Sequence, residues 1–374
     1  MVRGLTVGIL HNNSQEKVET TIDQLPRSSE RESPRVIIDG VSLAYHVLTP
    51  EDKEHSWEFV NGGDYRLYRQ KVTEFFQLLK SFAVDVAIVF PLSDGTPPIT
   101  EVSTARWNQK ELEKVRRACR IRTLLEKGMS TSRSLQEILP PFIIHEIAET
   151  SKENAVEVIY TRNNVTRFAS KYVAEKKADA VIGQNSDYLI FDQVNYIPLD
   201  SIVKNDKDEL QFDLLNNVIA ARIINLEKLD KMMELGILLG NPFTEPFVVS
   251  KYNMPNTLHI KLNPKYPASL VNGIVAHLNN PEFESIEATS PTKEIIAGDA
   301  EFQKAIEDSK AFFDIKAPLD PEGDSDIVKE TLAGNLPLFS KMVTFGMTHL
   351  LMITNIKSKH QSSPNQFVNS SIPF

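Results

Sequence analysis

The chain has 374 residues, of which 41% are hydrophobic and 24% are charged, an ordinary composition for a globular protein. It carries 50 Asp and Glu residues against 41 Lys and Arg residues, a formal net charge of −9. This balance excludes a general attraction of phosphate to the whole molecule. The single cysteine, Cys119, excludes an internal disulfide and fits a reducing compartment.

No apolar signal-peptide core opens the chain. The most apolar late stretch, residues 339–353, is too short to span a bilayer and contains Lys341. We therefore expect an intracellular protein of the nucleus or cytoplasm that is neither secreted nor bound to a membrane. The sequence contains no Gly-rich phosphate loop, no Cys/His metal spacing and no nucleophile elbow, so nothing supports the enzyme classes that depend on them.

Strand and helix patterns alternate along the first half of the chain. Residues 11–34 are polar and predict a loop, and the apolar run 35–39 predicts a buried strand. The pattern then predicts, in chain order, a helix over 40–48, a helix over 67–82, a strand over 84–90, helices over 106–125 and 142–150, a strand over 156–159, a helix over 163–176 and a strand over 180–182. Such alternation implies right-handed crossovers and an α/β fold with a mainly parallel sheet.

The second half predicts mostly helices. They are expected over 226–239, 267–279, 293–313 and 336–353. Taken together, the patterns predict an α/β domain over 1–245, a mainly helical C-terminal region over 246–357, and a disordered polar tail over 358–374.

Two aspartates stand at the ends of predicted strands. Asp39 closes the first strand, and Asp187 follows the strand over 180–182, within a strand-like run that extends over 183–192. Ligand sites in parallel sheets lie beyond the carboxyl ends of the strands, so both positions are candidates for a metal site. An aspartate at a strand end also accepts N–H groups of the next helix as a cap, which leaves a second interpretation of Asp39 open.

A basic segment lies between Arg106 and Arg133. It has nine positive and three negative side chains, a local charge of +6 in an acidic protein. The candidate nucleic-acid-binding residues of this segment are Lys110, Lys114, Arg116, Arg117, Arg120 and Arg122. The pattern fits contact with phosphates, and it also fits a solvated helix face.

Several short motifs occur together in a family-like order. They are Met1–Thr6, Val36–Gly40, Gly62–Tyr65, Leu139–Ile143, Asn185–Asp192 and Leu239–Asn241. This ordered set, over about the first 250 residues, resembles the Asteroid family of the XPG/flap-endonuclease superfamily. The resemblance implies a PIN-like, flap-endonuclease-type fold for residues 1–245. It also implies a Mg²⁺-dependent phosphodiesterase ancestor acting on branched or overhanging DNA or RNA.

Several acids of that family pattern are missing. The second strand is followed by Pro91, and Asp94 comes three residues late, which makes it a doubtful third metal position. The stretch 160–165 has no carboxylate, and Asn185 and Pro242 stand where acids are expected. A pair of Mg²⁺ ions about 4 Å apart needs clustered carboxylates to hold it. The retained acids therefore predict weak Mg²⁺ binding or none.

Three functions follow from these patterns. The first is a catalytically degenerate, Asteroid-like protein that binds nucleic acid or a protein partner. The second is a metal-dependent, structure-specific endonuclease with a rearranged site, which would depend on Asp39 and Asp187. The third is a protein-interaction scaffold, favoured by the acidic net charge and by the less family-like sequence after residue 250.

Overall fold

The computed structural model describes most of the chain between Val18 and Leu319. The described ranges are 18–27, 31–48, 64–91, 139–140, 142–161, 163–263 and 268–319, with the single residues Leu5, Arg116, Cys119, Thr123 and Lys127. Two compact units divide the chain. The first comprises 1–43, 75–92 and 154–321, and the second comprises 44–74, 93–153 and 322–374.

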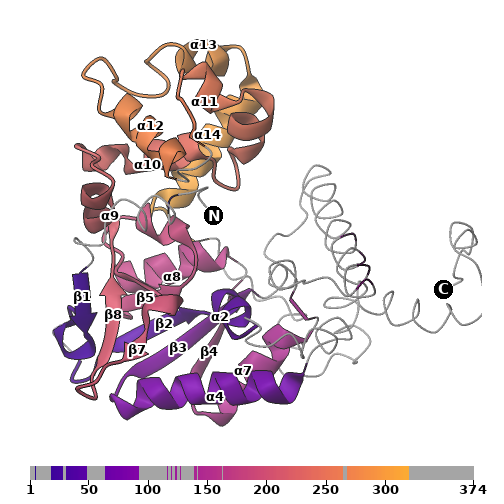
Figure 1. Ribbon diagram of the computed structural model, residues 1–374, viewed down its shortest axis with the longest axis vertical. Coiled ribbons are helices and arrows are strands. Elements are labelled where there is room, and N and C mark those ends of the chain that lie inside the picture. Colours follow the sequence, from indigo (N-terminus) through magenta and orange to yellow (C-terminus); the bar gives the residue numbers. More distant parts are fainter. Residues whose placement is uncertain are drawn as a thin grey trace, which may run out of the picture. The chain divides into compact units, whose positions relative to one another are not determined.

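A five-stranded parallel sheet forms the centre of the first unit (Figure 1). Its strand order is β4 (Glu157–Thr161), β3 (Asp85–Pro91), β2 (Arg35–Asp39), β5 (Ala180–Gly183) and β6 (Tyr196–Pro198). The β-branched run of β2 is buried on both faces, as expected for a central parallel strand. The predicted α/β class with a mainly parallel sheet is confirmed.

The register brings the carboxyl ends of the central strands to one edge of the sheet. Ile38 of β2 pairs with Ile88 of β3 on one side and with Ile182 of β5 on the other. Asp39 and Gly183 therefore end neighbouring strands at the same level. This edge is where sites are built in parallel sheets.

Helices form where the apolar periodicity predicts them. The structure contains α2 (Gly40–Val47), α4 (Tyr65–Ser81), α7 (Ile143–Glu153) and α8 (Val165–Ala174). The side chain of Asn164 caps α8 by accepting the N–H groups of Thr166 and Arg167. α8 packs on β2, β3 and β5 in the first unit. In the second unit, Arg69 of α4 forms ion pairs with Glu146 and Glu153 of α7.

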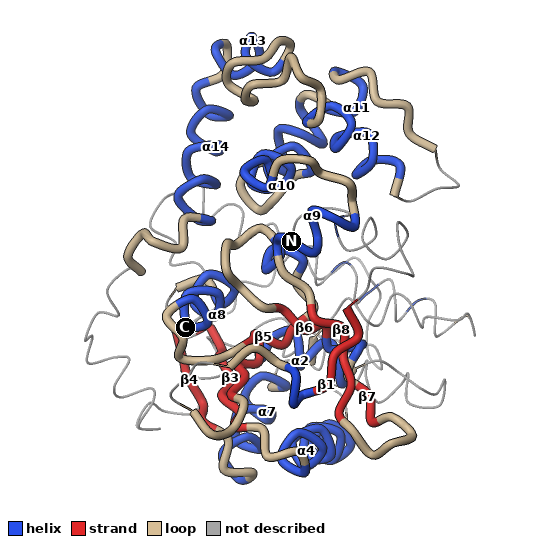
Figure 2. Tube along the Cα trace, turned by 90° about the vertical axis from the view of Figure 1, so that its left-hand side faces the viewer, coloured by secondary structure: helices blue, strands red, loops and turns tan. Residues whose placement is uncertain are grey.

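A second, antiparallel sheet has the order β1 (Val18–Thr21), β8 (Leu210–Leu214) and β7 (Val203–Lys204), and its strands lie side by side in Figure 2. The prediction of a loop throughout 11–34 is wrong at β1 and at the following 3₁₀ turn η1 (Ile22–Gln24). The strand forms because Glu19 and Thr20 pair with Asp213 and Phe212. Because β8 lies so far along the chain from β1, no local sequence pattern indicates that the two strands pair.

The rest of the first unit is mostly helical. It contains α9 (Asn217–Ile223), η5 (Leu229–Lys231), α10 (Met232–Leu239), the π-helical turn η6 (Pro246–Lys251), α11 (Met254–Thr257), α12 (Ser269–Leu278), α13 (Thr292–Ala297) and α14 (Ala300–Phe313). The single helix predicted over 293–313 is two helices, because the Asp299 side chain accepts the N–H groups of Glu301 and Phe302 and starts α14. The helix predicted over 336–353 lies outside the described residues.

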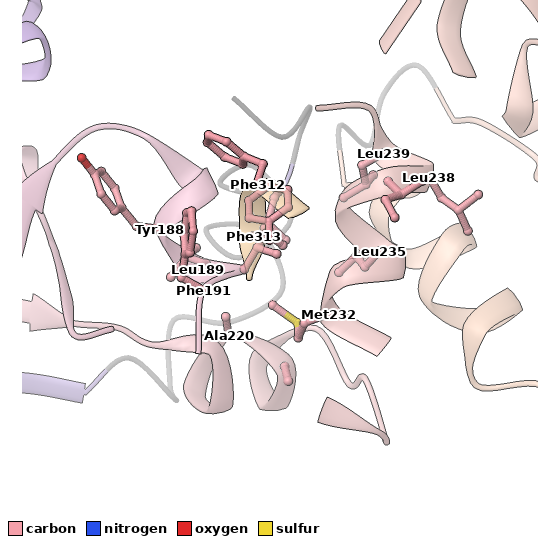
Figure 3. Packing of buried hydrophobic residues seen from close by; sticks show 14 of the residues in the cluster. Tyr188, Leu189, Phe191, Ala220, Met232, Leu235, Leu238, Leu239, Phe312 and Phe313 are labelled. Carbon is pink, nitrogen blue, oxygen red and sulfur yellow. The ribbon is translucent and has the colours of Figure 1, made fainter. Parts of the chain in front are cut away.

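One hydrophobic core joins the sheet to the helical region (Figure 3). The Phe191 ring lies 5.7 Å from the Phe312 ring and 5.1 Å from the Phe313 ring, centroid to centroid. All three belong to the first unit. The domain boundary at residue 245 stays a prediction. In the described part of the chain, we find no helix with the length and apolar character that crossing a bilayer requires.

Substitution of Gly40, at the start of α2, tests how closely the core is packed. A Cβ atom there would lie 2.1 Å from Cε1 of Phe90, which is fully buried in β3. We expect Gly40→Ala to lower the free energy of unfolding by about 2 kcal/mol, measured by urea denaturation, because the ring must move. Gly298→Ala is the matched control, since the nearest atom to its Cβ is 3.5 Å away. Equal losses in both variants would contradict this account.

Candidate functional site

Asp39 caps α2 from a buried position at the sheet edge. Its Oδ1 accepts the backbone N–H groups of Val41 at 3.0 Å and of Ser42 at 3.1 Å. Its Oδ2 accepts the hydroxyl of Tyr188 at 3.1 Å. The residue is only 5% exposed. The capping interpretation of Asp39 therefore describes its contacts in this structure.

A continuous chain of hydrogen bonds connects Asp39 to Asp187. The Thr166 hydroxyl bonds to the Tyr188 hydroxyl, and Thr166 Oγ1 accepts Nδ2 of Asn185 at 2.8 Å. The same Nδ2 lies 3.3 Å from Oδ2 of Asp187, which is 2% exposed. We call these five residues, Asp39, Thr166, Asn185, Asp187 and Tyr188, the Asp39–Asp187 network.

The local backbone explains how Asp187 and Tyr188 reach this position. β5 ends at Gly183, and residues Ser186–Leu189 form the 3₁₀ turn η3. The strand-like run predicted over 183–192 is therefore wrong after Gly183. The turn begins because the Asn185 side chain accepts the N–H of Asp187 at 3.1 Å, as asparagine commonly does at turns.

Two further contacts fix the Tyr188 ring. A Cβ atom at Gly183 would lie 3.1 Å from the Tyr188 ring, so glycine gives the ring room beside β5. On β6, the Tyr196 ring stacks on it at 5.4 Å between centroids, and the Tyr196 hydroxyl donates to the carbonyl oxygen of Gly183 at 3.1 Å. The ring is completely buried. Tyr188 is thus held in place on the Asp39 carboxyl group.

Burial dominates the electrostatics of the network. It raises the pKa of Asp39 above its ordinary value of 3.8, although the hydrogen bonds from Ser42, Tyr188 and Val41 act in the opposite direction. Burial, with the nearby Asp39 carboxylate, also raises the pKa of Tyr188 well above 10. The hydroxyl of Tyr188 therefore stays protonated and able to donate. Among the described residues, the donors that bond to Asp39 are all neutral groups, and none of them brings a positive charge to this carboxyl group.

These residues do not fit a pair of Mg²⁺ ions as they are arranged. Mg²⁺ needs oxygen atoms with free lone pairs in octahedral geometry. Oδ1 of Asp39 accepts two N–H groups and Oδ2 accepts one hydroxyl, so three of the roughly four lone pairs of this carboxylate are in use, and Oδ1 of Asn185 accepts the N–H of Asp187. Within the described ranges, no three His, Cys, Asp or Glu side chains gather in a way that could hold a metal ion. A single, weakly held cation at Asp39 or Asp187 stays a prediction.

The other predicted site residues lie mostly outside the described ranges. They are Asp94, Lys110, Lys114, Arg117, Arg120 and Arg122. Arg116 is described as an exposed helical residue of the second unit. The nucleic-acid-binding role of this segment and the metal role of Asp94 therefore stay predictions.

Sequence reasoning missed the polar groups that join the two aspartates. Tyr188 and Thr166 were not singled out, although Tyr188 directly follows Asp187. A buried tyrosine needs a hydrogen-bond partner for its hydroxyl. Asp39, at the end of the first predicted strand, was available as the acceptor. That requirement is the signal that could have identified the pair.

Among known proteins, this chain is similar to solved structures, but it matches no family model or curated sequence. Flap endonuclease-1 from Methanococcus jannaschii is 13% identical, covering 91% of this chain and 98% of its own, with a TM-score of 0.45. Human GEN1 in complex with Holliday junction DNA is 14% identical, covering 93% and 78%, with a TM-score of 0.45.

The catalytic core of Rad2 in complex with a DNA substrate is a further neighbour. It is 15% identical and covers 93% of each chain, with a TM-score of 0.38. All three neighbours are nucleases of the XPG/flap-endonuclease type. The α/β assignment rests on the strands and their register in this chain.

Proposed function

We propose that this chain is a catalytically degenerate, Asteroid-like protein of flap-endonuclease type that binds branched or overhanging nucleic acid without cutting it efficiently. The observation that carries the proposal is the state of Asp39. Its two oxygens bond to the start of α2 and to Tyr188, so the acid that matches the family's first metal position serves as a structural group. A two-metal phosphodiesterase needs several ligands gathered around the ions, and within the described ranges no three His, Cys, Asp or Glu side chains gather in that way.

The binding half of the proposal is supported by the basic segment between Arg106 and Arg133. Its charge of +6 contrasts with a net charge of −9 for the chain. Clustered lysine and arginine residues bind phosphates and release counterions, which makes affinity depend steeply on salt. The acidic remainder of the molecule favours contacts confined to this segment. A protein partner in place of nucleic acid is the alternative occupant.

The salt dependence of binding tests this half. We expect flap or overhang DNA or RNA to bind with an affinity that falls steeply as salt rises. Replacing Lys114, Arg117 and Arg120 together by glutamine should reduce the slope of log affinity against log salt by about 2 to 3, one unit or slightly less for each lost phosphate contact. Fluorescence anisotropy with labelled oligonucleotides measures this.

A matched control removes three exposed lysines elsewhere. Lys207, Lys293 and Lys304 are exposed, and replacing them by glutamine changes the net charge equally but should leave the slope unchanged. An affinity that does not respond to salt, or equal slopes in both triple variants, would exclude phosphate contact by the basic segment.

The catalytic half is tested by a cleavage assay with Mg²⁺ or Mn²⁺ on flapped substrates. We expect no metal-dependent cleavage by the purified protein. Cleavage that requires the metal and disappears in Asp187→Asn would replace the proposal with the active, rearranged endonuclease. Cleavage that survives Asp187→Asn and Asp39→Asn would come from a contaminant, and the proposal would then stand on the binding result.

A further inference from the structure

The Tyr188 side chain fills the space directly beside the Asp39 carboxyl group. Its hydroxyl lies 3.1 Å from Oδ2 of Asp39, and the Thr166 hydroxyl bonds to the same hydroxyl. In Figure 3 this hydroxyl points away from the Phe191 ring and from the other labelled residues of the hydrophobic cluster. The Tyr188 oxygen therefore occupies the point at which one oxygen of Asp39 and the oxygen of Thr166 converge.

Close packing fixes the Tyr188 ring in this position. The ring is fully buried, and Asp39 is only 5% exposed. The Tyr196 ring stacks on the Tyr188 ring with 5.4 Å between their centroids. A Cβ atom at Gly183 would lie 3.1 Å from Cε2 of Tyr188 and 3.4 Å from Cβ of Asp39, so the end of β5 adjoins both side chains. A ring packed in this way cannot move aside without disturbing its neighbours.

A divalent cation at Asp39 would need space that this packing does not leave. Mg²⁺ takes oxygen ligands at about 2.1 Å and usually keeps several of its water molecules, and Mn²⁺ prefers the same kind of site. Oδ2 is the oxygen of Asp39 that a cation could reach, because Oδ1 already accepts two N–H groups at the start of α2. The Tyr188 hydroxyl lies at Oδ2, so a cation with its water molecules there would overlap the Tyr188 side chain.

We infer that Tyr188 is the residue that excludes a divalent cation from Asp39, and that a shorter side chain at this position opens a cation site there. The opened site would take one Mg²⁺ or Mn²⁺, with Oδ2 of Asp39 and the Thr166 hydroxyl as ligands and water in the other positions. The sequence predicts weak Mg²⁺ binding or none, and the packing around Tyr188 favours none at Asp39.

This inference rests on the proposed function, in which Asp39 matches a metal position that the chain no longer uses. It adds a second cause to the loss of acids from the family pattern. Asn185 and Pro242 stand where acids are expected, and a retained acid is also closed off by the side chain of Tyr188. Restoring acids alone would therefore not restore a metal site.

Mn²⁺ titrations followed by electron paramagnetic resonance test the inference on the full chain, because bound Mn²⁺ loses the sharp signal of the free ion. We expect the unaltered protein and Asp39→Asn to bind Mn²⁺ equally, at surface carboxylates only. Tyr188→Leu shortens the side chain and keeps it apolar. It should bind Mn²⁺ about tenfold more tightly than the unaltered protein, the effect of roughly one charge-assisted contact. The gain should disappear in the double variant Tyr188→Leu/Asp39→Asn.

Two control variants separate an opened cation site from a loosened core. Phe191→Ala opens a cavity in the same hydrophobic cluster, beside the rings of Phe312 and Phe313, and should gain no Mn²⁺. Tyr188→Phe removes the hydroxyl but keeps the ring, and it should also gain none. Melting temperatures show whether each variant is folded.

Several results would overturn the inference. Weaker Mn²⁺ binding by Asp39→Asn than by the unaltered protein would show that a cation already reaches Asp39, and this comparison decides the question even if Tyr188→Leu does not fold. A folded Tyr188→Leu that gains no Mn²⁺, or a gain that survives Asp39→Asn, would also exclude Tyr188 as the barrier. An equal gain in Tyr188→Phe or Phe191→Ala would exclude the ring.

The proposed function can fail independently of this inference. Cleavage that disappears in Asp187→Asn would replace the proposed function with an active endonuclease, whatever the Mn²⁺ titrations of the Asp39 and Tyr188 variants show. A cation at Asp39 in a protein that binds nucleic acid without cutting it would overturn the inference alone.

Discussion

Asp39→Ala is expected to lower the free energy of unfolding by about 3 kcal/mol when it is measured near pH 4. The variant loses the acceptor for two N–H groups at the start of α2, a cap worth about 1 kcal/mol. It also leaves the buried Tyr188 hydroxyl without its acceptor, which costs about 1–3 kcal/mol. Urea denaturation followed by circular dichroism measures the difference.

Asp39→Asn separates the cap from the charge. Its carbonyl oxygen still accepts the N–H groups of Val41 and Ser42, and its amide donates to the Tyr188 hydroxyl, which then donates to Thr166. We expect this variant to lose less than about 1 kcal/mol near pH 4, because every buried polar group keeps a partner. A loss as large as that of Asp39→Ala would show that the negative charge itself stabilises the fold.

The pH dependence of stability shows whether the negative charge of Asp39 stabilises or destabilises the fold. Burial raises the folded-state pKa of Asp39 above its ordinary value of 3.8, so the folded protein binds this proton more tightly than the unfolded chain. The stability that this proton contributes is fully present below the ordinary pKa and is lost as pH rises through the folded pKa. Asp39→Asn has no such proton. Its stability relative to the unaltered protein should therefore increase with pH across that window and then stay constant.

The same measurement can contradict the conclusion that the pKa of Asp39 is raised in the folded protein. A relative stability of Asp39→Asn that falls as pH rises would mean that the folded-state pKa of Asp39 is depressed. That result would mean that the hydrogen bonds to the carboxylate, or a cation beside it, outweigh the effect of burial. Repeating the titration with added Mg²⁺ tells a bound cation from the hydrogen bonds.

The fold was predictable where the signal is local. The helix expected over 67–82 is α4, and the apolar residues that predict it, Val72, Phe76 and Leu79, are buried. The strand expected over 84–90 is β3 for the same reason, since a fully buried strand is apolar throughout. β1 was missed because its pairing partner β8 lies about 190 residues away in the sequence, and a short polar strand has no pattern of its own.

The position of the two aspartates could be predicted from the sequence, but the hydrogen bonds that connect them could not. Placing Asp39 and Asp187 at one sheet edge needed only the order of strands and the rule for parallel sheets. The partner of Asp39 could not be read from the chain, because Tyr188 lies 149 residues further on and its ring position depends on Gly183 and Tyr196. The sequence left both the metal interpretation and the capping interpretation of Asp39 open, and the backbone around Asp39 was needed to show that it accepts the N–H groups at the start of α2.

Phe191→Ala is expected to lower the free energy of unfolding by about 4 kcal/mol, the largest effect predicted for a single residue here. The ring is fully buried, and it contacts the rings of Phe312 and Phe313 at the end of α14. Phe142→Ala is the matched control, since this phenylalanine is 39% exposed and its loss should cost less than about 1 kcal/mol. Urea denaturation measures both.

The Phe191→Ala variant also tests whether the regions before and after residue 245 unfold together. A core that passes from the sheet to α14 makes each region stabilise the other, so hydrogen exchange in β5 and in α12 should speed up by the same factor in Phe191→Ala. If the two regions were independent domains that only touch, the variant would loosen one of them more than the other. Two separate unfolding transitions in the unaltered protein would support that arrangement, because a shared core unfolds as one unit.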